Sequence, residues 1–84
     1  MYKILIIEDA EIIVQIVKRH LESWGYEVFQ IEDFTHVIQE FVQKDPQLVL
    51  LDLKLPFFNG FHWCEEIRKI SQIPVMFLSS AADN

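Results

Sequence analysis

Apolar residues occur along this chain in two kinds of run, and the two kinds alternate. Residues 3–7 (KILII), 48–51 (LVLL) and 75–78 (VMFL) are short, nearly continuous apolar runs. Such runs are typical of strands buried on both faces of a parallel sheet. Residues 26–31 (YEVFQI) alternate well enough to predict a further strand, at an edge of the sheet.

The segments between these runs have helical spacing. Residues 10–24 predict a first helix that Gly25 ends. Residues 34–44 predict a second helix with Asp33 as its cap, and the turn pair Asn59-Gly60 precedes a third at about 61–70. The apolar residues expected to face the core are Ile13, Ile16, Val17, Leu21 and Trp24, then Phe34, Val37, Ile38, Phe41 and Val42, then Trp63, Cys64, Ile67 and Ile70.

The predicted elements alternate in the order βαβαβαβ. This order predicts an α/β fold, a parallel sheet with right-handed crossovers. At 84 residues and 51% hydrophobic content, the chain is one small globular domain. A net charge of −6 argues against nucleic-acid binding by this segment. Its single cysteine excludes an internal disulfide, and no apolar run approaches the roughly 20 residues of a membrane span. We therefore expect a cytoplasmic protein without membrane contact.

Polar side chains follow the predicted strands where each strand ends. Glu8 and Asp9 follow the first strand, Asp52 closes the run 48–51, and Ser79 follows the last strand. Because the carboxyl ends of parallel strands share one rim, these groups are expected to converge there. Clustered carboxylates repel one another unless a cation neutralises them, and their oxygens suit Mg²⁺. An aspartate beside a divalent ion also acts as a nucleophile toward phosphorus, which makes Asp52 the expected reactive group.

The segments KILIIEDA, LVLLDLKLPFFNG and IPVMFLSS resemble, in order and spacing, the receiver domain of two-component response regulators. The resemblance covers the whole chain. It implies a flavodoxin-like (CheY-like) fold with helices on both faces of a sheet ordered 2-1-3-4. It also implies a signalling phosphoacceptor rather than an enzyme, with a sensor histidine kinase as the phosphoryl donor.

The resemblance assigns a role to each site residue. Asp52 matches the phosphoacceptor, and Glu8 and Asp9 match the acidic pair that binds Mg²⁺ together with Asp52. Asp9 matches the direct ligand, and Glu8 acts through water. Lys54 matches the position whose backbone carbonyl binds the metal. Ser79 matches the switch hydroxyl that moves toward the phosphate.

The segments IEDA and FFNGFHWCEEIRKIS are most similar to regulators of the winged-helix (OmpR/PhoB-like) class, and within it to those responding to cell-envelope-active peptides in Gram-positive bacteria. Members of the family have a fifth strand, further helices and an effector domain. We therefore expect residues 1–84 to be the N-terminal part of a receiver domain, with any contact to DNA made through an effector domain. The fourth strand is then an open apolar edge, which favours self-association as a dimer, including one with exchanged elements.

Two other functions fit parts of the pattern. A magnesium-dependent phosphohydrolase with an aspartyl-phosphate intermediate is one, although residues 53–55 supply no second carboxylate after Asp52. A phosphorylation-independent interaction domain is the other. The sequence leaves open whether Phe57 and Phe58 pack inward or contact a kinase.

Overall fold

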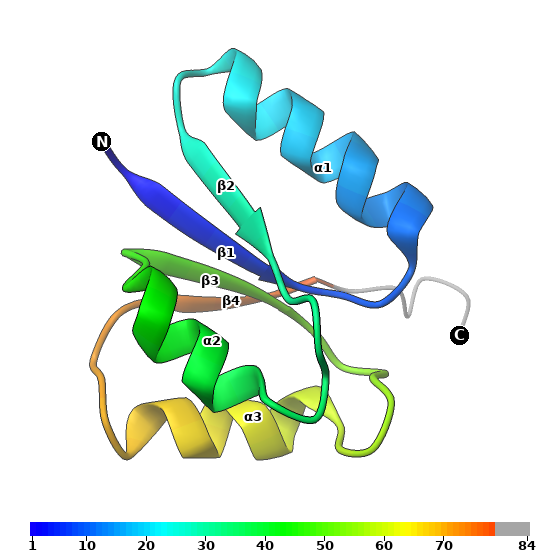
Figure 1. Cartoon of the computed structure of the whole chain (residues 1–84), viewed down its shortest axis with the longest axis vertical. Coiled ribbons are helices and arrows are strands. Elements are labelled where there is room, and N and C mark those ends of the chain that lie inside the picture. The colour runs from blue at the N-terminus through cyan, green and yellow to red at the C-terminus, as the bar shows by residue number, and fades with distance from the viewer. Residues whose placement is uncertain (79–84) are drawn as a thin grey trace.

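The computed structural model of this protein describes residues 1–78, and the expected position of Ser79 lies outside the described residues. Strands and helices alternate along this part of the chain, as predicted (Figure 1). In chain order they are β1 (Lys3–Ile7), α1 (Glu11–Ser23), β2 (Glu27–Gln30), α2 (Val37–Lys44), β3 (Leu48–Asp52), α3 (Gly60–Arg68) and β4 (Val75–Leu78).

The strands form one parallel sheet in the order β2-β1-β3-β4. This confirms both the flavodoxin-like order implied by the resemblance and the edge position predicted for the second strand. β1 lies between β2 and β3, and Ile7 is aligned with Leu51 at the end of the β1–β3 ladder. On the other side of β3, Asp52 is aligned with Leu78 of β4.

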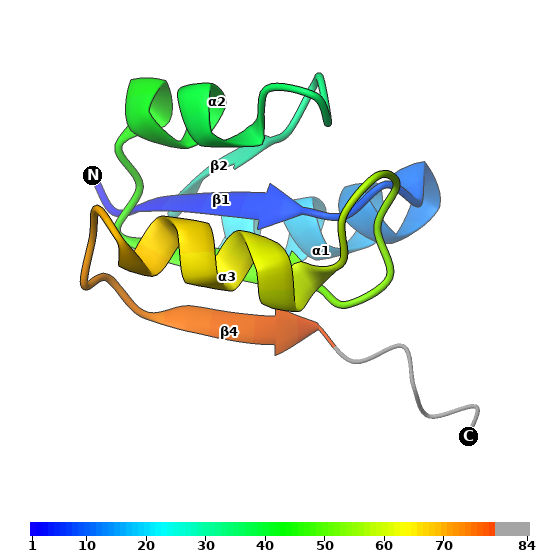
Figure 2. The ribbon, with the colours of Figure 1, turned by 90° about the horizontal axis from the view of Figure 1, so that it is seen from below.

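The helices cover both faces of this sheet. α1 lies on one face, and α2 and α3 lie on the other (Figures 1 and 2). Because side chains alternate along a strand, each face receives its own apolar set. The core on the α2–α3 face contains Leu5, Ile7, Val49, Leu51, Val37, Phe41, Trp63 and Ile67, and the core on the α1 face contains Ile4, Ile6, Val14, Val28 and Leu50.

The start predicted for the second helix is wrong by three residues. α2 begins at Val37, and Asp33 holds the turn before it instead of capping it. The Asp33 carboxylate accepts a hydrogen bond from the backbone N–H of Thr35 at 2.9 Å, and the Asp33 carbonyl accepts one from the N–H of His36 at 2.9 Å. Asp and Thr side chains that bond nearby backbone in this way compete with helix formation, which explains the later start.

The predicted apolar faces differ from the buried ones, and the prediction for α1 missed Val14. In α1 only Val14 is buried, whereas Ile16 and the following Trp24 are exposed. In the described residues no second helix lies beside α1 on its face of the sheet, so only the stripe that touches the strands is covered (Figure 1). Exposed positions that were expected to face the core are Ile13, Ile16, Trp24, Val42 and Ile70. Within residues 1–78, no helix is long and apolar enough to cross a membrane.

This burial pattern predicts different costs for the same substitution at two isoleucines. Ile67 in α3 is fully buried, so Ile67→Val is expected to lower the free energy of unfolding by about 0.5–1.5 kcal/mol. Ile12 in α1 is 73% exposed, so Ile12→Val is expected to change it by less than about 0.5 kcal/mol. Urea unfolding followed by circular dichroism measures both, and equal losses would contradict the assignment of the core.

Candidate functional site

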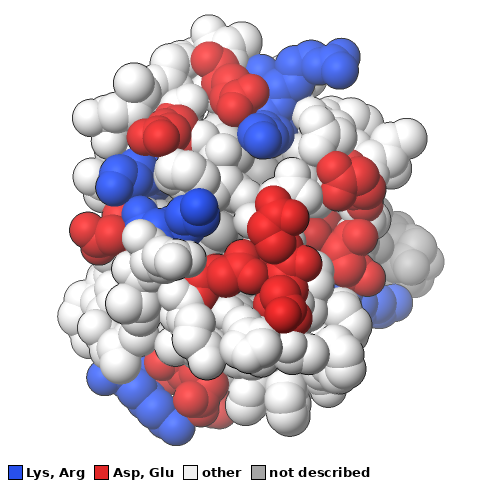
Figure 3. Space-filling view, viewed as in Figure 1, with Lys and Arg blue, Asp and Glu red and all other residues white. Residues whose placement is uncertain are grey.

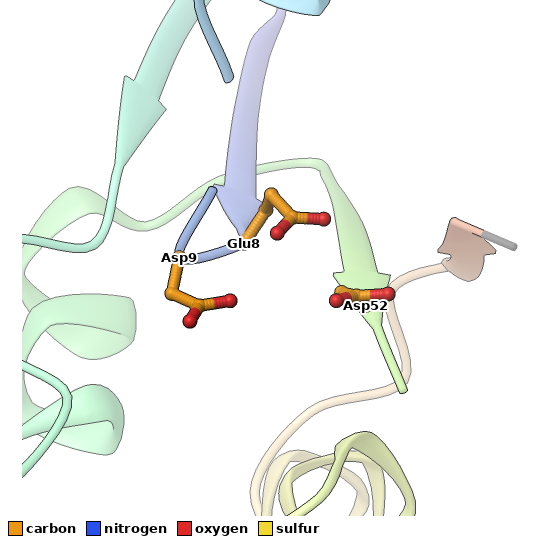
Figure 4. A group of neighbouring side chains, drawn as sticks. All are labelled: Glu8, Asp9 and Asp52. Atoms are coloured by element: carbon orange, nitrogen blue, oxygen red, sulfur yellow. The ribbon is translucent and has the colours of Figure 1, made fainter. Parts of the chain in front are cut away.

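Three carboxylates meet at the carboxyl ends of the two central strands. Glu8 and Asp9 directly follow β1, and Asp52 is the last residue of the neighbouring β3. One carboxylate oxygen from each residue lies within 4.8 Å of the others (Figure 4). The predicted convergence of these side chains is therefore confirmed. It follows from the parallel pairing of β1 and β3, because that pairing puts both strand ends on one rim.

The three carboxylates differ in their surroundings. Glu8 and Asp52 are only 5% and 4% exposed, whereas Asp9 is exposed. The backbone N–H of Ala10 donates a hydrogen bond to Glu8 Oε2 at 2.8 Å. Asp52 Oδ1 is buried without a hydrogen-bond partner in the described part of the chain. Buried polar atoms are rarely left without partners, so this oxygen marks a place where another group is expected to bind.

The burial of Glu8 and the negative charges of the neighbouring carboxylates both change the pKa of its side chain. Burial raises the pKa of the Glu8 carboxyl above its ordinary 4.5, and the carboxylates of Asp52 and Asp9 raise it further. The hydrogen bond from Ala10 lowers this pKa but does not cancel the rise. Ionised Glu8 is therefore less favourable in the folded chain than in the unfolded chain.

The donor set fits a magnesium ion. Mg²⁺ takes carboxylate and carbonyl oxygens and keeps several waters, so a few protein ligands at an open rim suffice. Here three carboxylates provide these oxygens, and one of the three, that of Asp52, also has a buried oxygen without a partner in the described residues. A divalent cation would also offset the repulsion that raises the pKa of Glu8.

The surroundings of the cluster are acidic as well. On the face shown in Figure 3, red side chains form a group near the middle and right, and further red and blue side chains are interspersed over the rest of the face. The chain carries 13 acidic residues against 7 Lys and Arg. This charge distribution attracts cations to the rim and disfavours contact with a nucleic-acid backbone.

The loop after β3 contains the remaining predicted residues. Lys54 is exposed in the bend two residues after Asp52. Phe57 and Phe58 are 72% and 50% exposed, so they do not pack inward as core residues. The Phe58 ring stacks on the His62 ring with 4.2 Å between centroids, which ties this loop to α3.

Sequence reasoning missed the role of Gly60. The sequence predicts only a turn at Asn59-Gly60, and in the structure Asn59 also caps α3 by accepting a hydrogen bond from the N–H of His62 at 3.0 Å. Gly60, however, is buried against the backbone of Asp52. The only signal in the sequence was a glycine at the start of a helix, where other residues are more favourable.

The pKa of Glu8 predicts how the stability depends on pH. Because this pKa is higher in the folded than in the unfolded chain, the folded chain binds more protons and is destabilised as pH rises from about 4.5 through the folded pKa. In EDTA, Glu8→Gln is expected to flatten this fall in the free energy of unfolding, measured by urea unfolding at several pH values. The control variant Glu65→Gln, at an exposed position of α3, should show the same fall in the free energy of unfolding as the parent. A parent-like fall in Glu8→Gln would contradict the assignment.

Comparison with known proteins places this site in a family. The family described as the response regulator receiver domain matches residues 4–84. The sensory transduction protein BceR of Bacillus subtilis is 48% identical over 80 residues, which are 95% of this chain and 35% of BceR. The chain thus spans about a third of the length of the curated relative.

Two solved structures share the fold. The N-terminal domain of the nisin resistance regulator NsrR, a lantibiotic response regulator, is 44% identical with a TM-score of 0.90, over all of this chain and 71% of that one. The complex of histidine kinase ThkA with response regulator TrrA is matched at 28% identity and a TM-score of 0.86, over 98% of this chain and 72% of that one. The chain belongs to the receiver domain family of two-component response regulators, and Glu8, Asp9 and Asp52 form the acidic cluster at its phosphorylation site.

Proposed function

We propose that this chain is a phosphoacceptor that takes a phosphoryl group from a sensor histidine kinase onto Asp52, with Mg²⁺ at the acidic cluster. One observation carries the proposal. Asp52 has a buried oxygen without a partner, in a carboxylate that lies within 4.8 Å of Glu8 and Asp9. A structural aspartate at a strand end would be exposed or have both oxygens hydrogen-bonded, whereas Asp52 is 4% exposed and its Oδ1 has no hydrogen-bond partner in the described residues.

The transfer is a displacement at phosphorus. A carboxylate oxygen of Asp52 donates an electron pair to phosphorus, and the bond from phosphorus to the histidine nitrogen of the kinase breaks. That nitrogen keeps the bonding electron pair, so an acyl phosphate and a free histidine result. Bound Mg²⁺ would offset the negative charge on the transferring group.

Each of the remaining site residues has its own proposed role in binding the metal ion or the phosphoryl group. Asp9 is the exposed carboxylate and is proposed as a direct ligand, while Glu8, fixed by Ala10, is proposed to act through water. The backbone carbonyl of Lys54 is proposed as the ligand from the loop after β3. Ser79, which lies outside the described residues, is proposed as the hydroxyl that bonds a phosphoryl oxygen.

The signalling context is also part of the proposal. The likeness to NsrR, named as a nisin resistance regulator, supports a role in the response to cell-envelope-active peptides. The solved complex of a histidine kinase with a related regulator supports a kinase as partner. A winged-helix effector domain is proposed to make any contact with DNA, which the acidic surface of this domain disfavours. Such a pathway operates in the cytoplasm.

We also propose that the chain of 84 residues associates with itself through β4. Within the described residues β4 forms an edge of the sheet, with Met76 58% and Phe77 41% exposed on its two faces. An edge strand with free backbone groups and apolar side chains is a template for pairing with another chain. Exchange of elements between copies would use the same edge.

Intact mass spectrometry tests the phosphoacceptor. After incubation with Mg²⁺ and a small-molecule phosphodonor, we expect one phosphoryl adduct in the parent and none in Asp52→Asn, because the amide keeps the shape but is not a nucleophile. The matched control is Asp45→Asn, at an exposed left-handed position that tolerates asparagine, and it should be labelled like the parent. Labelling of Asp52→Asn, or no labelling of the parent, would refute the assignment.

Sedimentation velocity at micromolar concentration tests the self-association. We expect dimers or larger assemblies for the parent and a shift to monomer for Met76→Lys, because a charge on an edge strand opposes pairing. The control Ile12→Lys changes an exposed apolar residue of α1, far from the edge in the sheet order, and should leave the assembly intact. A monodisperse monomeric parent would overturn this part of the proposal.

A further inference from the structure

Gly60, the first residue of α3, lies against the backbone that carries Asp52. A Cβ at position 60 would overlap the carbonyl oxygen of Asp52. It would also lie 3.0 Å from the carbonyl carbon of Asp52 and 3.0 Å from Cα of Leu53. These are backbone atoms at the end of β3, so they cannot move aside as a flexible side chain would. A side chain at position 60 therefore displaces the peptide that joins Asp52 to the loop.

A hydrogen bond links Gly60 to the next peptide along the chain, the one that joins Leu53 to Lys54. The backbone N–H of Gly60 donates to the carbonyl oxygen of Leu53 at 2.9 Å. The loop of residues 53–59 is thus closed at its base, with the start of α3 seated on the end of β3. The next residue, Lys54, is the one whose carbonyl is the proposed metal ligand.

The requirement for glycine at this position is one of space rather than of backbone conformation. Gly25 has a φ of +94°, which favours glycine, but nothing lies within 4 Å of a Cβ built there. Gly60 has no such φ and sits in a helix, where alanine is the better residue. Helix formation alone would favour alanine at 60, so the contact with Asp52 is what requires glycine.

We propose that Gly60 is a positioning residue for the phosphoacceptor site. Its missing side chain lets α3 close onto the Asp52–Leu53 peptide, and this contact sets the directions of the Asp52 carboxylate and the Lys54 carbonyl toward a shared cation. The inference rests on the proposed function of Asp52. It adds that the geometry of the cluster is set partly from α3, and not only by the pairing of β1 with β3.

The test compares three variants of the chain. Gly60→Ala adds the Cβ, Asn59→Ala removes the cap of α3 without adding an atom near Asp52, and Gly25→Ala strains a distant turn. Calorimetry measures the affinity for Mg²⁺ alone, and mass spectrometry measures the rate of labelling at saturating Mg²⁺. We expect Gly60→Ala to lose about tenfold or more in Mg²⁺ affinity, as when a supporting contact of a metal site is removed. Its labelling should slow as well, while the other two variants stay within about twofold of the parent.

All variants are measured in the same stabilising osmolyte, with folding checked by circular dichroism, so that lost stability is separated from lost geometry. Parent-like Mg²⁺ affinity in folded Gly60→Ala would overturn the proposal. An equal loss of Mg²⁺ affinity in Asn59→Ala would overturn it too. A Gly60→Ala chain that stays unfolded would also overturn it, because the role of Gly60 would then be structural. A parent that binds no Mg²⁺ and is not labelled would refute the proposed function itself, a result that differs from all of these.

Discussion

The parallel pairing of β1 with β3 is the constraint on which the rest of this structure depends. It runs from Ile4 aligned with Leu48 to Ile7 aligned with Leu51, and most of these side chains are almost fully buried. The same ladder holds Glu8 and Asp9 beside Asp52, although three carboxylates at this distance repel one another. Burial of the apolar ladder offsets that repulsion, so the fold is stable enough to hold a cluster that is unfavourable by itself.

The parts of the fold that follow from local pattern could be predicted from the sequence. Uninterrupted apolar runs identify the buried strands, and the rule that parallel strands end on one rim brings Asp52 to Glu8 and Asp9. The order of the strands is different. Alternation of strand and helix is compatible with several orders, and the order 2-1-3-4 came from the family resemblance. The structure confirms it.

The parts that depend on tertiary contact could not be predicted in this way. α1 has apolar residues on more than one side, so helical periodicity alone did not say which of them face the sheet: the predicted Ile16 is exposed, and Val14, which was not predicted, is buried. The start of α2 depended on the hydrogen bonds that Asp33 makes within its own turn. Gly60 contacts a residue eight positions earlier in the chain, across the loop, and no local pattern reports such an approach.

The buried Asp52 oxygen connects the site to the surrounding structure. Its lack of a partner costs stability in the described chain, and a bound cation or a phosphoryl group would remove that cost. The gain requires that the carboxylate keep its direction, and the proposed role of Gly60 is to fix that direction through the peptide between Asp52 and Leu53. Gly60 lies against this peptide and donates a hydrogen bond to the carbonyl of Leu53 just after it, so the start of α3 and the end of β3 are packed together without room for a side chain. The proposed role of Gly60 thus makes the direction of the Asp52 carboxylate depend on a helix as well as on the sheet, because the start of α3 and the end of β3 can pack this closely only when position 60 has no side chain.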